Sequence, residues 1–493
     1  MERPNIILIM CDQFRGDCLG FDGHPDVKTP YLDTLASQGI HYRNAYTACP
    51  SCIASRASLH TGLSPKNHGR VGYQDRVEWN YPQTMASVLS NAGYYTQAVG
   101  KMHVYPIRNL IGFHNVILHD GYVHSYRNTS MPSYEDSRFA DDYFYWFKDK
   151  MGISRDITDT GLESNCWMTR PWPYEEYLHP TNWVTDQAID FFRRRDRSKP
   201  FFLNISYVRP HPPFDAPKAF LDMYSNKQLS EPITGDWDDF DLLEKEGRVY
   251  NSQSGPIDKE QIRMARAGYY ACITHIDYEI GKLLEAMHQD CLMKNTIILF
   301  TADHGEMLCD HMRYRKAIPY QSSARIPMIL YGPEKYIKDT HKRSDKLVEL
   351  RDVMPTLLDI ANIEIPDNID GKSFLPGNES NKNEYIHGEH SYGYYSNHFI
   401  VTEYDKYIWF SQNGIEQYFR LDTDPTESHN AINDAEHADR IKYLRNILIK
   451  ELDGREEGYT DGTSLITQRP AQKYRKSVLE DFKKQYEEVN KGY

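Results

Sequence analysis

Short apolar runs recur along the chain, and each run ends abruptly in polar residues. The runs are rich in β-branched residues and lie at 5–10, 95–99, 201–208, 296–301 and 326–331. Continuous apolar runs of this length, without polar alternation, are typical of strands that are buried on both faces of a parallel sheet. They therefore predict a sheet that is covered on both sides.

Amphipathic segments of helical period separate these runs. Thr29-Pro30 predicts the start of one helix, because a capping residue precedes a proline in the first turn. Further helices are predicted at 84–91, 259–289 and 350–361. Since strands alternate with helices, the pattern favours an α/β fold with a large, mostly parallel sheet sandwiched by helices.

The pattern changes near residue 380. The polar run 377–383 is typical of a linker or surface loop, and Asn413-Gly414 farther along is a hairpin signal between two short apolar segments. We expect a small antiparallel sheet here, with a helix at about 435–452 packed on it. The tail after residue 460 is charged and carries no recognisable motif.

Two domains are therefore expected, and 493 residues are enough for a large domain and a small one. The large α/β domain is predicted at 1–380 and the C-terminal α+β subdomain with its tail at 381–493. An insertion at about 122–182 is dense in Tyr, Trp and Phe. Two interpretations stay open for it: a structural cluster that covers the sheet edge, or a lid or sugar-stacking rim beside a site.

Charge and cysteine content limit the function and the compartment. The net charge of −13 argues against nucleic acid as a partner, because no basic face is available. Eight sparse cysteines argue against a disulfide scaffold and for a reducing compartment. The first apolar run is too short for a signal peptide, and no run reaches membrane length, so we expect a soluble, cytoplasmic protein. Nothing in the sequence indicates an oligomeric state.

Titratable residues follow four of the predicted strands. In order along the chain these are Asp12 with Gln13, Lys101 with His103, His211, and Asp303 with His304, after which comes Lys316. In open α/β sheets, ligands bind at the carboxyl ends of the strands. The residues are therefore expected to converge on one site.

The segment 49–62 has its own chemical signature. Cys52 begins a predicted helix, whose free N–H groups favour anions, and Arg56 follows four residues later on the same face. The planar guanidinium suits sulfate or phosphate oxygens. The alternative is that Cys49 and Cys52 form a redox motif or half of a zinc site, although no second C-x-x-C completes such a site.

The sequence Cys52-Ile53-Ala54-Ser55-Arg56, followed by Thr-Gly at 61–62, resembles the signature of the sulfatase family, in which the leading cysteine is oxidised to formylglycine. Gly-Lys-Met-His at 100–103, Arg-Pro-His-Pro-Pro-Phe at 209–214 and Ala-Asp-His-Gly-Glu at 302–306 resemble further motifs of that family, in the family's order. The resemblance extends over nearly the whole chain except 122–182. It implies an alkaline phosphatase-like α/β fold with a small C-terminal antiparallel sheet plus helix.

The resemblance also implies a divalent cation. Asp12, the modified Cys52, Asp303 and His304 would be its ligands. We expect Ca²⁺, because relatives with Asp-His in this motif use it, with Mn²⁺ and Mg²⁺ as alternatives. Gln13 stands where many members have a second aspartate, so it is interpreted as a neutral ligand or a contact to the substrate.

The remaining motif residues have roles by the same analogy. Lys101 and Lys316 would bind sulfate oxygens, and His211 would bind and protonate the leaving alcohol. His103 would assist the nucleophile, and Arg56 would position the hydrated formylglycine, whose two hydroxyls attack sulfur and later expel sulfate. His311, in contrast, is expected to be a structural partner.

The function implied is a sulfuric ester hydrolase that cleaves a sulfated carbohydrate or an aryl sulfate. A formylglycine-generating or anaerobic maturation enzyme would be its partner in modification. Two alternatives remain open: a phosphonate monoester or phosphodiester hydrolase of the same superfamily, and a non-catalytic protein that binds an anion or a glycan.

Overall fold

The computed structural model describes residues 3–121, 136–152, 154–239, 258–377 and 382–490. Its strands are β1 (Asn5–Asp12), β2 (Ile40–Tyr46), β3 (Tyr95–Gly100), β4 (Asn115–Leu118), β5 (Phe201–Pro210), β6 (Thr296–Ala302), β7 (Met328–Tyr331), β8 (Lys342–Glu349), β9 (Ile386–His390), β10 (Asn397–Val401), β11 (Lys406–Phe410) and β12 (Glu416–Phe419). Its α-helices are α1 (Pro30–Gln38), α2 (Cys52–Thr61), α3 (Pro65–His68), α4 (Met85–Asn91), α5 (Ser137–Ala140), α6 (Asp142–Met151), α7 (Pro180–Arg194), α8 (Lys218–Leu221), α10 (Lys259–Gln289), α11 (Gln321–Ala324), α12 (Val353–Ile360), α13 (Ala438–Leu452) and α14 (Lys476–Asn490).

A mixed, mostly parallel sheet forms the centre of the molecule. Its order is β4-β3-β5-β1-β6-β7-β2-β8, and β7 runs antiparallel to both of its neighbours. The five strands from β4 to β6 are mutually parallel, and the apolar runs predicted four of them, β1, β3, β5 and β6. The run 326–331 also forms a buried strand, β7, but this strand is antiparallel. The sequence did not predict β4, β2 or β8, of which β2 and β8 pair with each other in parallel.

The register of the parallel strands aligns their carboxyl ends. Cys11 of β1 pairs with Ala302 of β6, and Asp12 pairs with Pro210 of β5. On the other side, Gly100 of β3 pairs with Ser206 of β5. The residues that directly follow these strands therefore emerge at the same edge of the sheet, where α/β proteins bind ligands.

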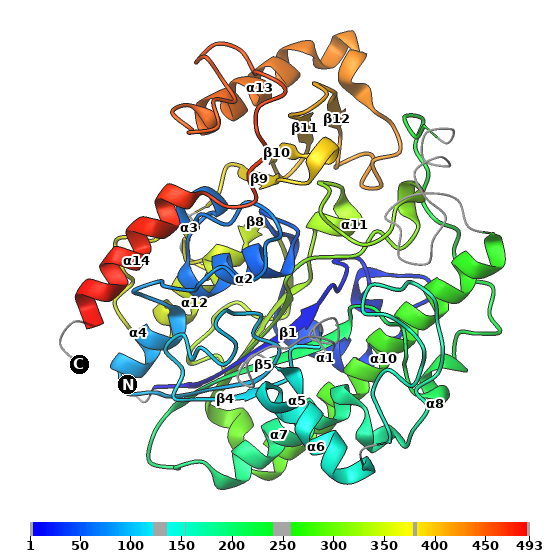
Figure 1. Ribbon diagram of the computed structural model, residues 1–493, viewed down its shortest axis with the longest axis vertical. Helices are drawn as coiled ribbons and strands as arrows, with labels where there is room; N and C mark the ends of the chain where they lie inside the picture. Colours follow the sequence, from blue (N-terminus) through cyan, green and yellow to red (C-terminus); the bar gives the residue numbers. More distant parts are fainter. Residues whose placement is uncertain (1–2, 122–135, 153, 240–257, 378–381, 491–493) are drawn as a thin grey trace.

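Helices cover both faces of this sheet (Figure 1). One layer contains α1, α7, α8 and the long α10, and the other contains α2, α3, α4 and α12. The predicted helix at 259–289 matches α10, which is capped by the side chain of Asp258. Because helices on both sides exclude water, the central strands are buried almost throughout, and one continuous apolar core spans the large domain.

The small antiparallel sheet, β12-β11-β10-β9, lies between the large domain and α13 and contacts both. Its alternating side chains serve two cores: Phe399 packs with Tyr46 and Leu347 of the large domain, whereas Ile400 packs with Leu444 of α13 on the other face. The expected sheet with a helix on it is thus confirmed. The α-helix begins at Ala438, because a separate 3₁₀ turn occupies 435–437.

Part of the aromatic insertion lies outside the described residues, namely 122–135 and 153. In the described part, Tyr143 and Phe147 of α6 are fully buried, and Trp167 and Trp172 are at most 6 % exposed. These rings join the core of the large domain. These aromatic rings therefore serve packing, as the structural interpretation of the insertion implies, whereas other residues of the insertion, Ser164 and Asn165, line a pocket.

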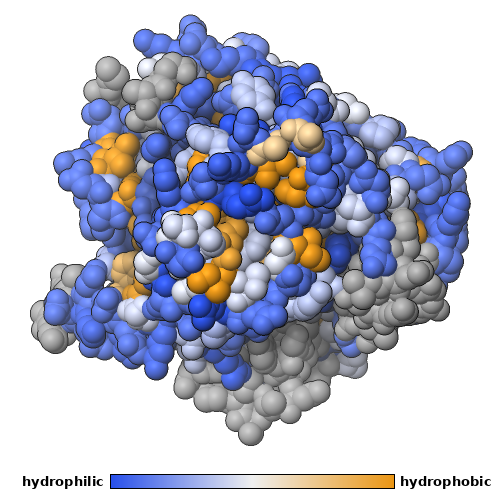
Figure 2. Space-filling view, turned by 90° about the horizontal axis from the view of Figure 1, so that it is seen from above, coloured by the Kyte–Doolittle hydropathy of each residue, from blue (hydrophilic) through white to orange (hydrophobic). Residues whose placement is uncertain are grey.

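The surface seen from above is largely hydrophilic, and apolar residues appear only in separate areas (Figure 2). None of the described helices combines the length and the apolar character that crossing a bilayer requires.

All eight cysteines are free thiols, so the prediction that no disulfide scaffold exists is confirmed.

Candidate active site

A pocket of about 190 Å³ lies at the carboxyl edge of the central sheet. Five of the predicted site residues line it: Cys52, Lys101, His103, His211 and Lys316. They come from four segments that are separated by up to 264 residues along the chain. The fold therefore brings these five residues together in one pocket, as predicted.

Cys52 is the first residue of α2 and is 2 % exposed. Burial and the nearby Asp12 raise the pKa of its thiol, but Lys101, Lys316 and His304 lower it more strongly, so the net pKa lies well below the ordinary value. The Nζ atom of Lys316 lies 3.4 Å from Sγ. The positive side chains around position 52 thus outweigh the effect of Asp12 and favour negative charge on this side chain.

Four side chains gather into one buried cluster: Asp12, Cys52, Asp303 and His304. Their candidate ligand atoms lie within 4.8 Å of one another. His304 Nε2 lies 3.2 Å from Cys52 Sγ and 3.5 Å from Asp12 Oδ1. Two carboxylates and one imidazole at this spacing are a suitable donor set for a divalent cation.

The two carboxylates of the cluster differ in their electrostatic surroundings. Burial raises the pKa of Asp12, but Lys101, His211 and Lys316 lower it well below its usual range. Burial and the charge of Asp12 raise the pKa of Asp303. Like charges that are held together in a buried site repel each other, and a bound cation relieves such repulsion.

Arg56 is fully buried and connects several parts of the site. Its Nε donates to Asp303 Oδ2 at 3.0 Å, and its Nη1 donates to the carbonyl of Lys101 at 2.8 Å and to Ser206 Oγ at 3.0 Å. Its Nη2 has no hydrogen-bond partner among the described residues. One face of α2 thereby fixes both the cluster and the loop that follows β3.

Two lysines and one histidine approach the cluster from the pocket. Lys101 pairs with Asp12, and Lys316 donates to the amide oxygen of Gln13 at 2.7 Å. The backbone N–H of His211 donates to the carbonyl of Asp12 at 3.0 Å. Burial, together with Lys316, lowers the pKa of His211 well below its ordinary value, so its ring is neutral at pH 7.

His103 is held by residues that the sequence did not single out. Its Nε2 lies 3.4 Å from Asp75 Oδ1, and Tyr73 donates to the other oxygen of Asp75 at 2.8 Å. Its backbone N–H, at φ 57°, donates to Asp120 at 2.9 Å. Asp120 follows β4 closely, so the strand-end argument could have found it, whereas Asp75 lies in a loop without such a signal.

Gln13 lies behind the pocket lining and is 1 % exposed. Its amide nitrogen donates to Glu306, and its amide oxygen accepts from Lys316 at 2.7 Å. Its backbone is left-handed, with φ 69°, and the N–H donates to Asp303 at 2.9 Å. The structure thus shows Gln13 orienting Lys316, and its direct contact with a substrate or cation stays a prediction.

Two motif glycines permit close approach of the backbone. A Cβ atom at Gly305 would lie 2.0 Å from the carbonyl oxygen of Ser322, and a Cβ atom at Gly100 would lie 2.0 Å from that of Ser206. Side chains at these positions would push apart the segments that carry Lys101 and Asp303. The glycines are therefore part of how the site is built.

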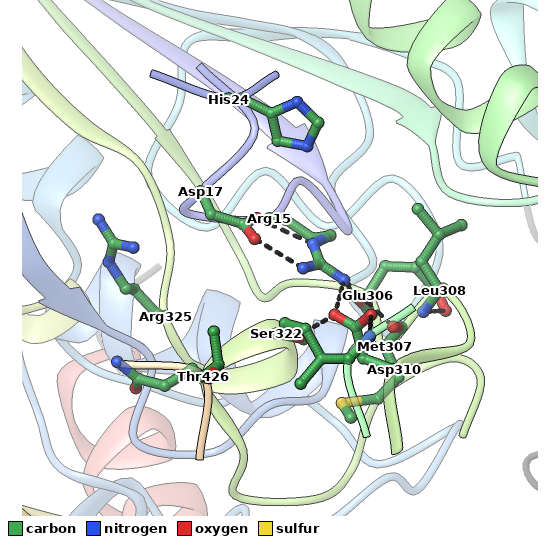
Figure 3. Close-up of polar contacts among 12 residues, drawn as sticks. Arg15, Asp17, His24, Glu306, Met307, Leu308, Asp310, Ser322, Arg325 and Thr426 are labelled. Carbon is green, nitrogen blue, oxygen red and sulfur yellow. Dashed lines mark hydrogen bonds and ion pairs between the residues drawn. The ribbon is translucent and has the colours of Figure 1, made fainter. Parts of the chain in front are cut away.

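An ionic network, buried except for Asp17, supports the loop after β6 (Figure 3). Arg15 pairs with Asp17 and Asp310, and it also donates to the carbonyls of Glu306 and Met307 at 3.2 and 3.1 Å. Asp310 in turn accepts from Ser322 at 2.8 Å. Because Glu306 binds Gln13, this network connects the outer loop to the site.

The expectation that His311 is structural is confirmed. Its ring stacks on Trp237 with the centroids 4.6 Å apart, and its nitrogens lie 3.2 Å from Asp238 and from the carbonyl of Thr426.

Cys49 is buried but does not belong to the four-residue cluster. Cys49 and Cys52 are both free thiols, so the two do not form a disulfide.

Sequence reasoning missed most of the outer pocket. The residues concerned are Tyr73, Ser164, Asn165, Arg315, His390, Ser391, Tyr392 and Lys473. Ser164 and Asn165 belong to the insertion at 122–182, for which a rim beside a site was one of the two interpretations. The others come from loops, from the end of β9 and from the C-terminal tail, so no buried strand of the large sheet leads to them. Only the tertiary structure brings them to the pocket.

The mostly parallel sheet thus carries a buried cluster of candidate cation ligands and two lysines at its carboxyl edge, an arrangement that suits an enzyme acting on an anionic ester. The chain matches the family model Sulfatase over residues 4–363 and the model N-sulphoglucosamine sulphohydrolase, C-terminal, over residues 309–453. The chain therefore belongs to the sulfatase family.

Individual relatives agree with this assignment. The chain is 54 % identical to an arylsulfatase of Clostridium perfringens over 472 residues, which cover 95 % of this chain and 98 % of the relative. It is 26 % identical to human arylsulfatase K over 460 residues, covering 87 % of this chain and 79 % of the relative. The predicted enzyme class, a sulfatase, is confirmed.

Solved structures share the fold at lower identity. The structure of BT4656 in complex with its substrate D-glucosamine-2-N,6-O-disulfate is 22 % identical, with a TM-score of 0.69, and the match covers 92 % of this chain and 98 % of that one. The phosphonate monoester hydrolase of Agrobacterium radiobacter is 23 % identical, with a TM-score of 0.72, and the match covers 95 % and 100 %. At these identities the likeness establishes the fold alone.

Proposed function

We propose that this chain hydrolyses a sulfate monoester of a small aryl or sugar alcohol, with formylglycine at position 52 and a divalent cation beside it. The observation that carries the proposal is the buried cluster of Asp12, Cys52, Asp303 and His304, which two lysines face from the pocket. The arylsulfatase of Clostridium perfringens, at 54 % identity, supports a sulfate ester as the substrate.

The cluster suits a cation by its chemistry. Asp12 and Asp303 offer hard oxygen ligands, and His304 offers a nitrogen, so Ca²⁺ is our first choice, with Mn²⁺ and Mg²⁺ as alternatives. When it is bound, the cation offsets the negative charge of the sulfate group. Arg56 and the backbone N–H of Gln13 hold Asp303 in its orientation from behind.

Position 52 requires a maturation step. Conversion of the cysteine side chain to an aldehyde replaces sulfur and two hydrogens by one oxygen, and a formylglycine-generating or anaerobic maturation enzyme would carry it out. The hydrated aldehyde supplies two hydroxyls on one carbon. The Sγ atom of Cys52 stands for one of these oxygens, and its 3.4 Å distance to Lys316 supports stabilisation of negative charge there.

The chain's own cations and histidines have distinct tasks. Lys101 and Lys316 bind the sulfate oxygens, and both lie within the pocket. His211 binds the ester oxygen of the alcohol. The negative charge of the bound ester favours the protonated form of His211, which delivers its proton to that oxygen as the bond to sulfur breaks. His103, held by Asp75, takes up a proton at position 52 and returns it.

The first test follows the modification itself. Mass spectrometry of the Cys52 peptide should show a loss of about 18 Da in the active protein, and turnover of 4-nitrophenyl sulfate should rise with the converted fraction. Cys52→Ala should fold normally and lose nearly all turnover, because no hydroxyl remains to attack. The matched control is Cys49→Ala, which should keep the activity. If Cys52→Ala remained fully active, the proposal would be wrong.

The second test distinguishes the ester class. Rates on 4-nitrophenyl sulfate are compared with rates on an aryl phosphonate monoester, before and after chelation and after readdition of Ca²⁺, Mn²⁺ or Mg²⁺. We expect sulfate to be preferred and the activity to depend on the cation. A preference for the phosphonate would instead support the alternative function, and a protein that binds both esters without turnover would be a binding protein.

A further inference from the structure

The tail of the chain returns from the small subdomain to the active site. After α13 it runs back beside α3 and ends in α14, which lies against that helix (Figure 1). The N–H of Val71 donates to the carbonyl of Lys473 at 3.1 Å, and the N–H of Arg475 donates to the carbonyl of Gly69 at 2.7 Å. We call residues 468–490 the C-terminal strap.

The strap meets the end of β9 at the same place. The N–H of Ser391 donates to the carbonyl of Val71 at 2.7 Å, so the segment 69–72 lies between the strap and the small sheet. At Gly72 a Cβ atom would lie 2.8 Å from the carbonyl oxygen of Ser391 and 3.3 Å from Cα of Lys473. Backbone hydrogen bonds on both sides therefore fix the position of Lys473.

Lys473 lines the same pocket as Lys101 and Lys316 but comes from a different segment, the C-terminal strap. With His390, Ser391 and Tyr392 it forms the wall that the C-terminal part of the chain contributes. No aspartate or glutamate is found among the described residues that line the pocket, and no described carboxylate forms an ion pair with Lys473. In an acidic protein of net charge −13, a pocket wall of this kind favours an anion.

His390 adds a second, independent observation. It is 1 % exposed, it lines the pocket, and neither ring nitrogen has a hydrogen-bond partner among the described residues. Burial lowers the pKa of His390 to about 3, so the ring is neutral at pH 7. Buried polar atoms without partners are costly, and a bound ligand would satisfy them.

We propose that Lys473, together with His390, forms a subsite for an anionic group on the alcohol part of the substrate, a carboxylate or a second sulfate. The substrate is then a sulfate ester with two negative groups, one at the reacting sulfate and one at the strap. This inference rests on the proposed function for the reacting end. Lys473 determines specificity and takes no part in bond cleavage.

The test compares two matched esters, 4-nitrophenyl sulfate and 4-carboxyphenyl sulfate, by the release of sulfate. In Lys473→Ala, KM for the carboxylate ester should rise about three- to fivefold, the upper part of the range expected for one partly exposed charge pair, and kcat should stay nearly constant. KM for the nitro ester should change less than about twofold. Lys473→Arg should restore the lower KM, and added salt should reduce the difference.

The matched control is Lys476→Ala, which removes a cation from the same strap outside the pocket. Lys476 is exposed and pairs with Glu480 at 3.6 Å. Its loss should leave both KM values unchanged. A disulfated monosaccharide, added as a competitor, distinguishes a second sulfate from a carboxylate as the bound group. Its affinity and that of the carboxylate ester are each measured with the unaltered protein and with Lys473→Ala. The compound whose affinity falls more in Lys473→Ala carries the anion that the subsite prefers.

A binding measurement separates this inference from the proposed function. Calorimetry with both esters on Cys52→Ala, with and without Lys473→Ala, needs no turnover. If the unaltered protein binds the esters but hydrolyses neither, the proposed function fails, while a selective loss of carboxylate-ester affinity still supports the subsite. If Lys473→Ala weakens both esters equally, or neither, the subsite assignment is wrong.

Discussion

At the scale of single residues, the site is built from side chains that are held by other side chains. Arg56 fixes Asp303, Gln13 orients Lys316, and Asp75 lies against His103. Such supporting contacts decide the orientation of the groups that would touch the substrate, since a misplaced group loses much of its effect. The motif residues are therefore necessary but do not complete the site.

Asp75 gives a prediction at this scale. In Asp75→Asn, His103 loses the carboxylate that faces its Nε2 at 3.4 Å, so kcat should fall about tenfold while KM changes little. Steady-state kinetics on 4-nitrophenyl sulfate measure both constants, and thermal unfolding checks that the fold is intact. An unchanged kcat would mean that Asp75 does not position His103.

At the scale of elements, a buried ion pair ties β9 to the segment after α13. Arg455 donates through both terminal nitrogens to Glu389, at 2.9 and 3.0 Å, and also binds Glu457 at 2.6 Å. All three side chains are at most 8 % exposed. Breaking one partner of a buried pair leaves the other charge uncompensated, which is costly.

The pair predicts how stability depends on pH. Burial raises the pKa of Glu389, but Arg455 and His398 lower it to about 2, below the ordinary value of 4.5. Between these values the unfolded chain binds more protons, so the contribution to stability is complete above about pH 4.5 and is lost as the pH falls towards 2. The shift corresponds to about 3 kcal/mol.

Glu389→Gln should lower the unfolding temperature at pH 7 and flatten its decline between about pH 4.5 and 2. The control is Glu416→Gln, which breaks the more exposed pair with Arg445 in the same subdomain. That pair contributes about 1 kcal/mol or less, so the control should change the unfolding temperature only slightly. Equal effects of the two variants would contradict the importance of the buried pair.

At the scale of the whole molecule, the two parts of the chain meet around one pocket. The small sheet packs its inner face on the large domain, and the strap passes from it to α3. Phe482 of α14 packs edge-to-face on Tyr81, with the ring centroids 5.1 Å apart. The pocket wall that carries Lys473 therefore depends on the docking of a terminal helix.

Phe482→Ala tests this dependence. Loss of the ring should weaken the docking of α14 by about 1 to 3 kcal/mol, the range for a partly buried aromatic side chain. Limited proteolysis should then cut the strap faster, and KM for 4-carboxyphenyl sulfate should rise towards that of Lys473→Ala. Lys484→Ala, at an exposed position of the same helix, should leave both readouts unchanged.

The sequence by itself determined five strands of the large sheet, β1, β3, β5, β6 and β7, and the chemistry that follows four of them. Continuous apolar runs can only be buried strands here, and the polar residues directly after them must emerge where the strands end, so the positions of Asp12, Lys101, His211 and Asp303 were predictable. The helix start at Cys52 placed Arg56 on the same face for an equally local reason.

Only the tertiary structure decided the outer pocket. Asp75, His390 and Lys473 lie in a loop, at the end of a small-sheet strand and in the tail, and no local period connects them. Their meeting depends on contacts between segments hundreds of residues apart, such as the hydrogen bond from Val71 to Lys473. Local patterns report which face of an element is buried, whereas long-range packing alone determines which elements share a pocket.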